Sequence, residues 1–127
     1  MSDLRPRGVP IVLDGEERHL LFTLNVICEL QDRRDKALNE IMEELADEKK
    51  SPYAMREIVT LLLNDEAERT EKKSGVQHEK VTEREVGTMV AMDNYSEVMR
   101  AIFRAYGQSF PEPEDNDPNT ESGTMSN

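Results

Sequence analysis

The side chains that could do chemistry in this sequence belong to one cysteine, two histidines and two pairs of adjacent carboxylates. Cys28 could act as a nucleophile, but the sequence places no base near it, so we expect a small, half-buried apolar residue. His19 and His78 lie far apart and outside any metal-ligand spacing, which favours one histidine on a strand surface and one in a loop. The sequence therefore predicts neither a nucleophile nor a metal site at these positions.

The carboxylate pairs and the glycines indicate no further site. The two side chains of Glu43-Glu44, and those of Asp65-Glu66, are adjacent and do not share one helix face, which favours solvated charge over an acid–base pair. The six glycines are scattered and form no phosphate-binding loop. The segment Asp14–Glu17 lacks the other acidic positions of a calcium loop. We therefore expect no enzymatic activity, no cofactor and no bound metal.

Methionine and aromatic residues make the one pattern that indicates a binding function. A methionine side chain adapts its shape, and apolar grooves rich in methionine bind varied helices. A cluster of this kind lies between residues 89 and 103 and forms either ordinary core or a groove for a helical partner. The wide apolar side of a helix over residues 52–70 is the other candidate surface. The candidate partner-binding residues are Met89, Met92, Tyr95, Met99 and Phe103 in the cluster, with Leu61 and Leu63 on the helix.

Composition limits the classes of partner. The length of 127 residues predicts one domain, over residues 9–107. Charged residues make up 34% of the chain, above the usual share of about a quarter. Sixteen Lys and Arg against 27 Asp and Glu give a formal net charge of -11. This charge favours solubility and argues against binding to nucleic acid or to an anionic membrane, because both would repel the chain.

The sequence also indicates a cellular compartment. It begins with no signal peptide, and the apolar run Ile58–Leu63 is too short to cross a membrane. A single cysteine cannot form an internal disulfide, which fits a reducing environment. We therefore expect a cytoplasmic protein.

Residues 9–22 have the pattern of a β-hairpin. Apolar residues alternate from Val9 to Leu13, and Asp14-Gly15 is the strongest turn dipeptide in the chain. A two-residue loop would place Ile11 opposite Arg18. A four-residue loop would place Ile11 opposite an apolar residue, Leu20, so the apolar match predicts the longer loop, over residues 14–17.

Helical patterns fill the rest of the domain. Thr23 or Asn25 caps a first helix, over about residues 24–33, whose apolar side is expected to cover the hairpin. Thr82 and Glu85 form a capping box near the start of a later helix. The apolar stripe shifts by roughly 140° across Asp93-Asn94, which favours two helices there, although one long helix also fits. The remaining helices are expected over residues 36–48, 52–70, 83–92 and 94–106.

The two ends of the chain differ from this domain. Residues 1–8 are expected to form a flexible lead-in. Residues 108–127 contain five acidic residues, no basic residue and three prolines, a composition typical of disorder. The predicted fold is therefore mainly α (α+β), with an N-terminal β-hairpin packed on a small bundle of four to five helices and a disordered acidic tail.

The N-terminal pattern resembles a known family. An apolar strand, then Asp-Gly, then Leu-x-Phe-Thr and a helix of the form Leu-x-x-Ile-x-Glu-Leu, is similar to the small tail assembly chaperones of long-tailed bacteriophages (siphophages) and prophages. The later helices and the acidic C-terminus match the layout of that family. The matching residues are Val12, Leu13, Asp14, Gly15, Leu20, Phe22, Thr23, Leu24, Ile27, Glu29 and Leu30.

This resemblance implies a function without catalysis. A tail assembly chaperone binds the long, helical, aggregation-prone tape measure protein in the cytoplasm of the bacterial host and is absent from the finished virion. The resemblance also implies a longer form, made by ribosomal frameshifting, that recruits the tail tube protein, and self-association is a further possibility. The alternatives from the residues alone are an acidic inhibitor that mimics nucleic acid, or a generic small interaction module. The 16 basic residues mixed among the acids argue against the mimic.

Overall fold

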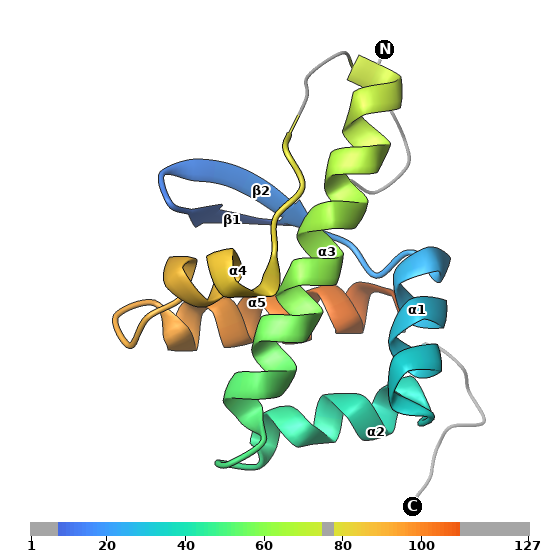
Figure 1. The fold of residues 1–127 in the computed structure, drawn as a ribbon, viewed down its shortest axis with the longest axis vertical. Coiled ribbons are helices and arrows are strands. Elements are labelled where there is room, and N and C mark those ends of the chain that lie inside the picture. Colours follow the sequence, from blue (N-terminus) through green and yellow to red (C-terminus); the bar gives the residue numbers. More distant parts are fainter. Residues whose placement is uncertain (1–7, 75–77, 110–127) are drawn as a thin grey trace, which may run out of the picture.

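A long central helix, α3 (Ser51–Ser74), organises the computed structural model, which describes residues 8–74 and 78–109 (Figure 1). The other elements, in chain order, are β1 (Val9–Leu13), β2 (Glu16–Leu20), α1 (Leu24–Arg34), α2 (Leu38–Glu43), the 3-10 helix η1 (Glu44–Ala46), α4 (Glu83–Met89) and α5 (Tyr95–Ser109). Helix α3 packs against β2, α1, η1 and α4, while α5 packs against both strands. The described part of the chain is mainly helical with one N-terminal hairpin, which confirms the predicted fold class.

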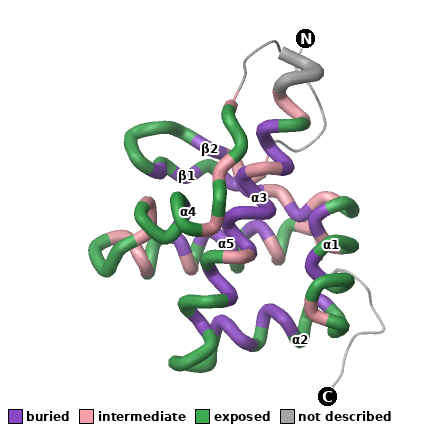
Figure 2. The backbone as a smooth tube through the Cα atoms, viewed as in Figure 1, coloured by how far each residue is buried: buried purple, intermediate pink, exposed green. Residues whose placement is uncertain are grey.

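The core is centred on the middle turns of α3, where buried residues follow one another along the helix (Figure 2). A helix that is apolar on nearly all sides must be surrounded by other elements. Burying each large aliphatic side chain contributes about 1.5–3 kcal/mol, so docking of neighbours on α3 stabilises the whole domain. The buried apolar residues of α3 are Ala54, Met55, Ile58, Val59, Leu61, Leu62, Leu63 and Ala67.

The hairpin turn has two residues, Asp14 and Gly15, and the predicted four-residue loop is wrong. Both residues have positive φ, 55° and 78°, as a type I′ turn requires. The resulting register sets Ile11 opposite Arg18. This pairing is stable because Arg18 is itself buried against α3, so it shares the inner face of the hairpin with its apolar neighbours.

Helices α3 and α5 cover the hairpin, whereas the sequence predicted that the first helix would cover it. Phe22, which follows β2, is buried, and its ring meets the ring of Tyr106 on α5 edge to face, with centroids 6.2 Å apart. The hydroxyl of Ser109 donates a hydrogen bond to the carbonyl oxygen of Phe22 over 3.4 Å. Phe22 therefore joins the hairpin to α5.

The open end of the hairpin is held closely. Gly8 has a φ of 107°, and a Cβ at this position would lie 2.6 Å from the carbonyl oxygen of Leu20. Only glycine fits here, because it has no side chain and tolerates the positive φ. Within the strand pair, Pro10 lies opposite His19.

Helix α1 begins at a capped turn and has a single buried stripe. The hydroxyl of Thr23 accepts a hydrogen bond from the backbone amide of Val26 over 3.3 Å, so Thr23 is the N-cap. Val26 and Leu30 are buried on the side that faces the core. Cys28 is exposed, and the prediction of a half-buried cysteine is wrong. Cys28 is two positions from both Val26 and Leu30, and residues two positions apart in a helix point to nearly opposite sides.

The helix predicted over residues 36–48 is divided into α2 and η1 and ends at Ala46. Asp35 adopts a left-handed conformation, with a φ of 54°, and this delays the start of α2. The side chain of Asp47 accepts hydrogen bonds from the backbone amides of the two lysines that precede α3. This local turn competes with further helix and ends η1.

Two helices, α4 and α5, occupy the region where one long helix also fitted the sequence. Thr82 and Glu85 form the predicted capping box, with both reciprocal hydrogen bonds present. The break depends on Asn94, whose side-chain oxygen accepts from the amide of Ala91 and whose side-chain nitrogen donates to the carbonyl of Met89. These bonds replace those of a continuous helix and fix the α4–α5 loop.

Helix α5 continues through Gly107 to Ser109, so the expectation that Gly107 ends the ordered part is wrong. A glycine near a helix end lowers helix stability only modestly, and the contact between Ser109 and the hairpin favours the last turn. The predicted flexible lead-in (apart from Gly8) and the predicted acidic tail from Phe110 onward lie outside the described residues, as do residues 75–77.

Candidate docking surface

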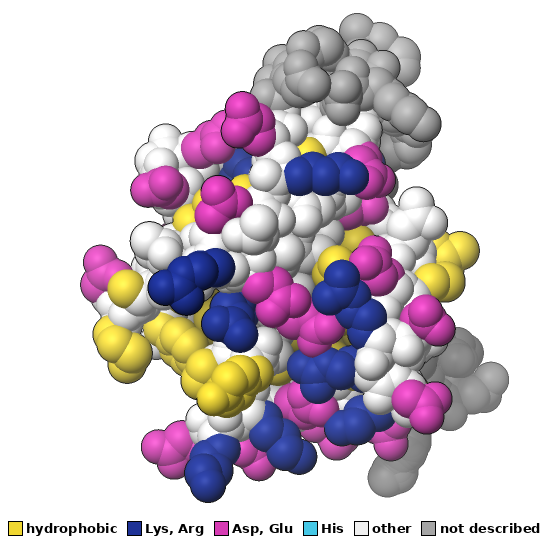
Figure 3. All heavy atoms as spheres, viewed as in Figure 1, with side chains coloured by type: hydrophobic (Ala, Val, Ile, Leu, Met, Phe, Trp, Pro, Cys, Tyr) yellow, Lys and Arg dark blue, Asp and Glu magenta, His cyan; other side chains and the backbone are white. Residues whose placement is uncertain are grey.

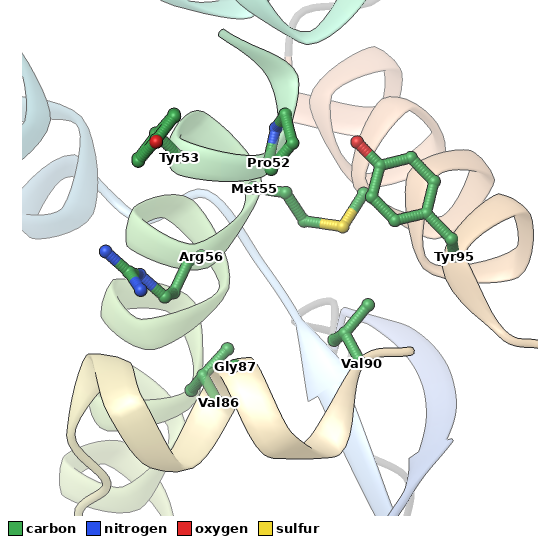
Figure 4. Close-up of a pocket in the computed structure, with 8 residues that line it drawn as sticks. All are labelled: Pro52, Tyr53, Met55, Arg56, Val86, Gly87, Val90 and Tyr95. Atoms are coloured by element: carbon green, nitrogen blue, oxygen red, sulfur yellow. The ribbon is translucent and has the colours of Figure 1, made fainter. Parts of the chain in front are cut away.

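An open pocket of about 330 Å³ lies where the first turns of α3 face α4 and the start of α5 (Figure 4). Its walls are mostly apolar, and they come from three elements that are distant in the sequence. This volume is at the lower end of the range for binding pockets, about 300–1,000 Å³. The lining residues are Pro52, Tyr53, Met55, Arg56, Val86, Gly87, Val90 and Tyr95.

The position of each wall follows from local chemistry. Pro52 is in the first turn of α3, where the missing amide hydrogen costs nothing because the amides there have no helical partner. The hydroxyls of Ser51 and Tyr95 form a hydrogen bond, which joins the start of α5 to the start of α3. Val86 is buried and anchors α4 to the core. The pocket is therefore part of a fixed framework.

Gly87 leaves the α4 wall open. A Cβ at this position would lie 3.4 Å from the Cδ of Arg56, so a larger side chain would begin to fill the pocket. Glycine inside a helix costs about 1 kcal/mol relative to alanine. Arg56 reaches the same edge from α3, where its Nε lies 3.7 Å from a carboxylate oxygen of Glu83.

Exposed apolar side chains surround the pocket. Met92, in the α4–α5 loop, is 86% exposed, and Tyr53 is 68% exposed. Figure 3 shows hydrophobic side chains gathered over the α4–α5 loop and the first turns of α3. Large exposed apolar side chains that gather in one place mark interaction sites. We call this surface the docking patch. Pro52, Tyr53, Val90 and Tyr95 of the patch line the pocket, and Met92 belongs to the loop between Val90 and Tyr95.

The predicted methionine and aromatic residues do not form one surface. Met92 and Tyr95 belong to the docking patch, and Met89 is half-buried against the core. Met99 is also half-buried against the core, further along α5, and Phe103 lies beyond it with 39% of its surface exposed. The cluster is therefore divided. Met89 and Met99 pack against the core, whereas Met92 and Phe103 are exposed.

Leu61 and Leu63 belong to the core and offer no surface to a partner. Their exposed fractions are 7% and 1%. The wide apolar side of α3 is covered because β2, α1 and α4 all pack on that helix. This finding removes the second surface that the sequence proposed.

A buried ion pair joins the hairpin to α3. The Nε of Arg18 lies 2.8 Å from Oε1 of Glu66, and a second guanidinium nitrogen donates to the carbonyl of Leu63 over 3.0 Å. The Nδ1 of His19 lies 3.0 Å from Oε2 of the same carboxylate. The side chains of Arg18 and Glu66 are 4% and 2% exposed. The expectation of solvated charge at Asp65-Glu66 is therefore wrong, because Glu66 faces the hairpin and Asp65, also buried, pairs with Arg69 of the same helix over 2.9 Å.

Glu66 remains ionised in this environment. Burial alone would raise the pKa of Glu66, but hydrogen bonds from the backbone and side chain of His19 and from Arg18, together with the charge of Arg18, hold the pKa below its usual value. A carboxylate that accepts several hydrogen bonds keeps its charge even when buried. The group therefore contributes stability only in its charged form.

We expect the fold to lose stability as the pH falls below about 4.5, the usual pKa of a glutamate. Because the pKa of Glu66 is lower in the folded state, its contribution is complete above the unfolded pKa and disappears as the pH falls through the folded pKa. Urea unfolding measured from about pH 7 to about pH 3 tests this. The Arg18→Met/Glu66→Leu variant should lose less stability over the same range, and an equal loss would contradict the assignment.

For the second carboxylate pair, Glu43-Glu44, the expectation of solvated charge is correct for Glu43 and wrong for Glu44. Glu43 is exposed, but Glu44 is buried, with oxygens paired to Arg34 and, over 2.7 Å, to Lys36. Burial would raise the pKa of Glu44, yet the hydrogen bonds and charges of these two cations lower it. Arg34 also pairs with Glu57 of α3 over 2.7 Å, so the ions connect α1, η1 and α3.

The sequence could identify part of this surface. Tyr53 carries a weak signal, since a large aromatic residue stands outside the apolar stripe of its helix.

Among the described residues, no group of three or more His, Cys, Asp or Glu could hold a metal ion. No helix in that part of the chain is both long and apolar enough to cross a membrane. Comparisons with protein-family models, with curated proteins and with solved structures find no match for this chain.

Proposed function

We propose that this chain is a phage tail assembly chaperone whose docking patch binds an apolar helical segment of a tape measure protein in the bacterial cytoplasm. The observation that carries the proposal is Met92, which is 86% exposed in the loop between Val90 and Tyr95, two residues that line an open apolar pocket. The choice of the tape measure protein as the client rests on the resemblance of the N-terminal pattern to the chaperone family. The patch gives that client a place to bind.

The patch has the chemistry of a site for helices. An amphipathic helix binds by placing a few apolar side chains into a groove. The pocket has room for such side chains, and the exposed Tyr53 at the pocket and the exposed Met92 in the adjoining loop offer further apolar contact. Because methionine has three rotatable bonds, it can fit different segments of a long client. A chaperone for a repetitive helical protein needs this tolerance.

The net charge supports a second requirement of a chaperone, which is to keep the complex with its client in solution. The chain carries -11, and residues 108–127 contribute five acidic residues and no basic ones. A high net charge keeps a protein in solution and extends to the complex that it forms with an aggregation-prone partner. The longer frameshifted form and its binding to the tail tube protein stay predictions of the resemblance.

Met92→Glu should leave the fold intact and abolish co-purification with tape measure segments. The side chain is exposed, so the substitution costs little stability, but in the complex it would bury an unpaired carboxylate against apolar groups. Circular dichroism reports the fold, and co-expression with a tape measure segment followed by a pull-down reports binding.

Leu24→Glu is the matched control, because Leu24 is 73% exposed but lies on α1, outside the patch. It should bind the segment as well as the wild type does. If Met92→Glu also binds as well as the wild type, the patch is not the client site.

A further inference from the structure

The outer face of α5 combines two positive charges with an exposed aromatic ring. Arg100 and Arg104 are four positions apart, so they lie on the same side of the helix, and both are exposed. Phe103 is adjacent to Arg104 in the chain and is 39% exposed. The buried residues of α5 are Val98, Ala101, Ile102 and Ala105. We call the outward surface formed by Arg100, Phe103 and Arg104 the α5 face.

The two arginines of the α5 face have no acidic partner in the described part of the chain. Neither takes part there in an ion pair or a side-chain hydrogen bond, in contrast to Arg18, Arg34 and Lys36, which all pair with carboxylates. The one acidic residue of the helix, Glu97, lies in its first turn and forms no ion pair with them. A chain with a net charge of -11 therefore has a local positive surface on α5.

The segment that follows α5 has the opposite charge. Helix α5 ends at Ser109, and residues 110–127, which lie outside the described residues, contain five acidic residues and no basic residue. Pro111 and Pro113 disfavour a continuation of the helix, so the sequence favours a change of chain direction directly after α5. We call residues 110–121 the acidic segment. Its acidic residues are Glu112, Glu114, Asp115, Asp117 and Glu121.

The acidic segment is long enough to reach both arginines. With a rise of about 1.5 Å per residue, Arg104 and Arg100 lie about 7.5 Å and about 13.5 Å before Ser109 along α5. An extended chain spans about 3.3 Å per residue, which gives about 10 Å from Ser109 to Glu112 and about 20 Å to Asp115. A chain that turns back over the helix therefore brings carboxylates to both cations.

We propose that the acidic segment turns back and binds the α5 face of its own chain. Its carboxylates pair with Arg100 and Arg104, and the segment covers the ring of Phe103. Single ion pairs at a protein surface are weak, but here several carboxylates share two arginines, and the short tether keeps them at a local concentration on the order of millimolar. This contact goes beyond the proposed function, because it needs no client and uses no residue of the docking patch.

The bound segment changes what other chains can reach. Arginine and aromatic side chains are among the residue types that contribute most to protein interfaces, so an uncovered α5 face would attract acidic segments of other proteins. The acidic segment is tethered beside this face and occupies it first. It therefore acts as an internal competitor that keeps the α5 face from unrelated acidic partners.

Paramagnetic relaxation enhancement in the full chain tests the proposal. A nitroxide is attached at Ser122→Cys, directly after the acidic segment, in a Cys28→Ser background, because Cys28 is exposed and is the one cysteine of the chain. At about 0.05 M salt the label should broaden the amide resonance of Phe103, and at about 1 M salt, where the screening length is about 3 Å, the enhancement should fall several-fold. Equal enhancement at both salt concentrations, or none at either, would overturn the contact.

Charge reversal with a matched control identifies the cations. Arg100→Glu/Arg104→Glu should reduce the enhancement at Phe103 several-fold at low salt. The control, Lys49→Glu/Lys50→Glu, makes the same change in net charge at two exposed lysines, and it should keep the wild-type enhancement. These lysines precede α3 near the start of α5, at the opposite end of that helix from the acidic segment. Circular dichroism checks that both variants are folded, and an equal loss of enhancement in both would overturn the assignment to the α5 face.

A charge exchange tests the pairing itself. Adding Glu114→Arg/Asp115→Arg to Arg100→Glu/Arg104→Glu places opposite charges together again, so the enhancement at Phe103 should recover. Failure to recover would overturn the pairing of carboxylates with these arginines.

A mixed sample tests which copy supplies the segment. Spin-labelled chain without isotope enrichment is mixed with isotope-enriched chain without a label, and the α5 resonances of the enriched chain should stay sharp. Broadening in the mixture would show that the α5 face binds the segment of a second copy, and it would overturn the contact within one chain.

Discussion

Replacing Glu66 by alanine is expected to lower the free energy of unfolding by about 3–5 kcal/mol. The substitution leaves the guanidinium of Arg18 buried with no opposite charge, and it removes the acceptor for the ring of His19. Breaking a buried ion pair from one side is costly because the remaining charge cannot reach water. Urea denaturation monitored by circular dichroism measures the change.

A double substitution separates the cost of a lone charge from the value of the pair. Arg18→Met/Glu66→Leu removes both charges and keeps apolar volume, so it should recover most of the stability that Glu66→Ala loses. The two results together give the coupling between the residues. A loss of less than about 1 kcal/mol in Glu66→Ala would mean that water reaches Arg18. That result would contradict the buried pair.

Phe22→Ala is the second large effect, with an expected loss of about 3–5 kcal/mol. The ring is buried between the hairpin and α5, where it meets Tyr106, and its removal leaves a cavity that the neighbouring backbone cannot fill. Thermal and urea unfolding both report the change. Because a small domain has a total stability of about 5–15 kcal/mol, the variant should be close to unfolding.

Leu24→Ala is the control for this measurement. Leu24 lies two residues further along the chain and is 73% exposed, so its truncation should change stability by less than about 0.5 kcal/mol. Equal midpoints for Phe22→Ala and the wild type would show that the hairpin does not contribute to the cooperative fold.

Local signals in the sequence were sufficient for most of the secondary structure. The capping residues Thr23 and Thr82 mark helix starts because their hydroxyls bond within the next few residues. The break between α4 and α5 is also local, since Asn94 closes the loop on Met89 and Ala91. Interactions of this range depend only on neighbouring residues, so a pattern along the chain reveals them.

Apolar matching between the strands predicted the wrong hairpin register. A charged residue on the inner face of a strand is acceptable only if a partner meets it, and the partner of Arg18 is Glu66, 48 residues away. Without that knowledge, apolar matching favours the longer loop. The positive φ of both turn residues was readable from Asp14-Gly15, and it is the stronger evidence.

The candidate site was predicted only in part for a similar reason. Met92 and Tyr95 stand out by residue type, but the pocket that Tyr95 lines is completed by Pro52, Val86 and Gly87 from two other elements. The periodicity of one segment gives no information on which turns of distant helices meet it. Leu61 and Leu63 were predicted to bind a partner but are buried in the core. The sequence of an apolar helix is the same whether its wide side contacts a partner or the rest of its own fold.

The carboxylate of Glu66 also affects whether a strand of another chain can pair with the hairpin. Each strand of a two-stranded sheet has an outer edge whose free amides can pair with a strand of another chain. On β2, the backbone amide of His19 is already bonded to Glu66. On β1, the facing residue Pro10 has no amide hydrogen to offer. Each edge thus lacks one of its outward amides, which makes the addition of a strand from another chain less favourable.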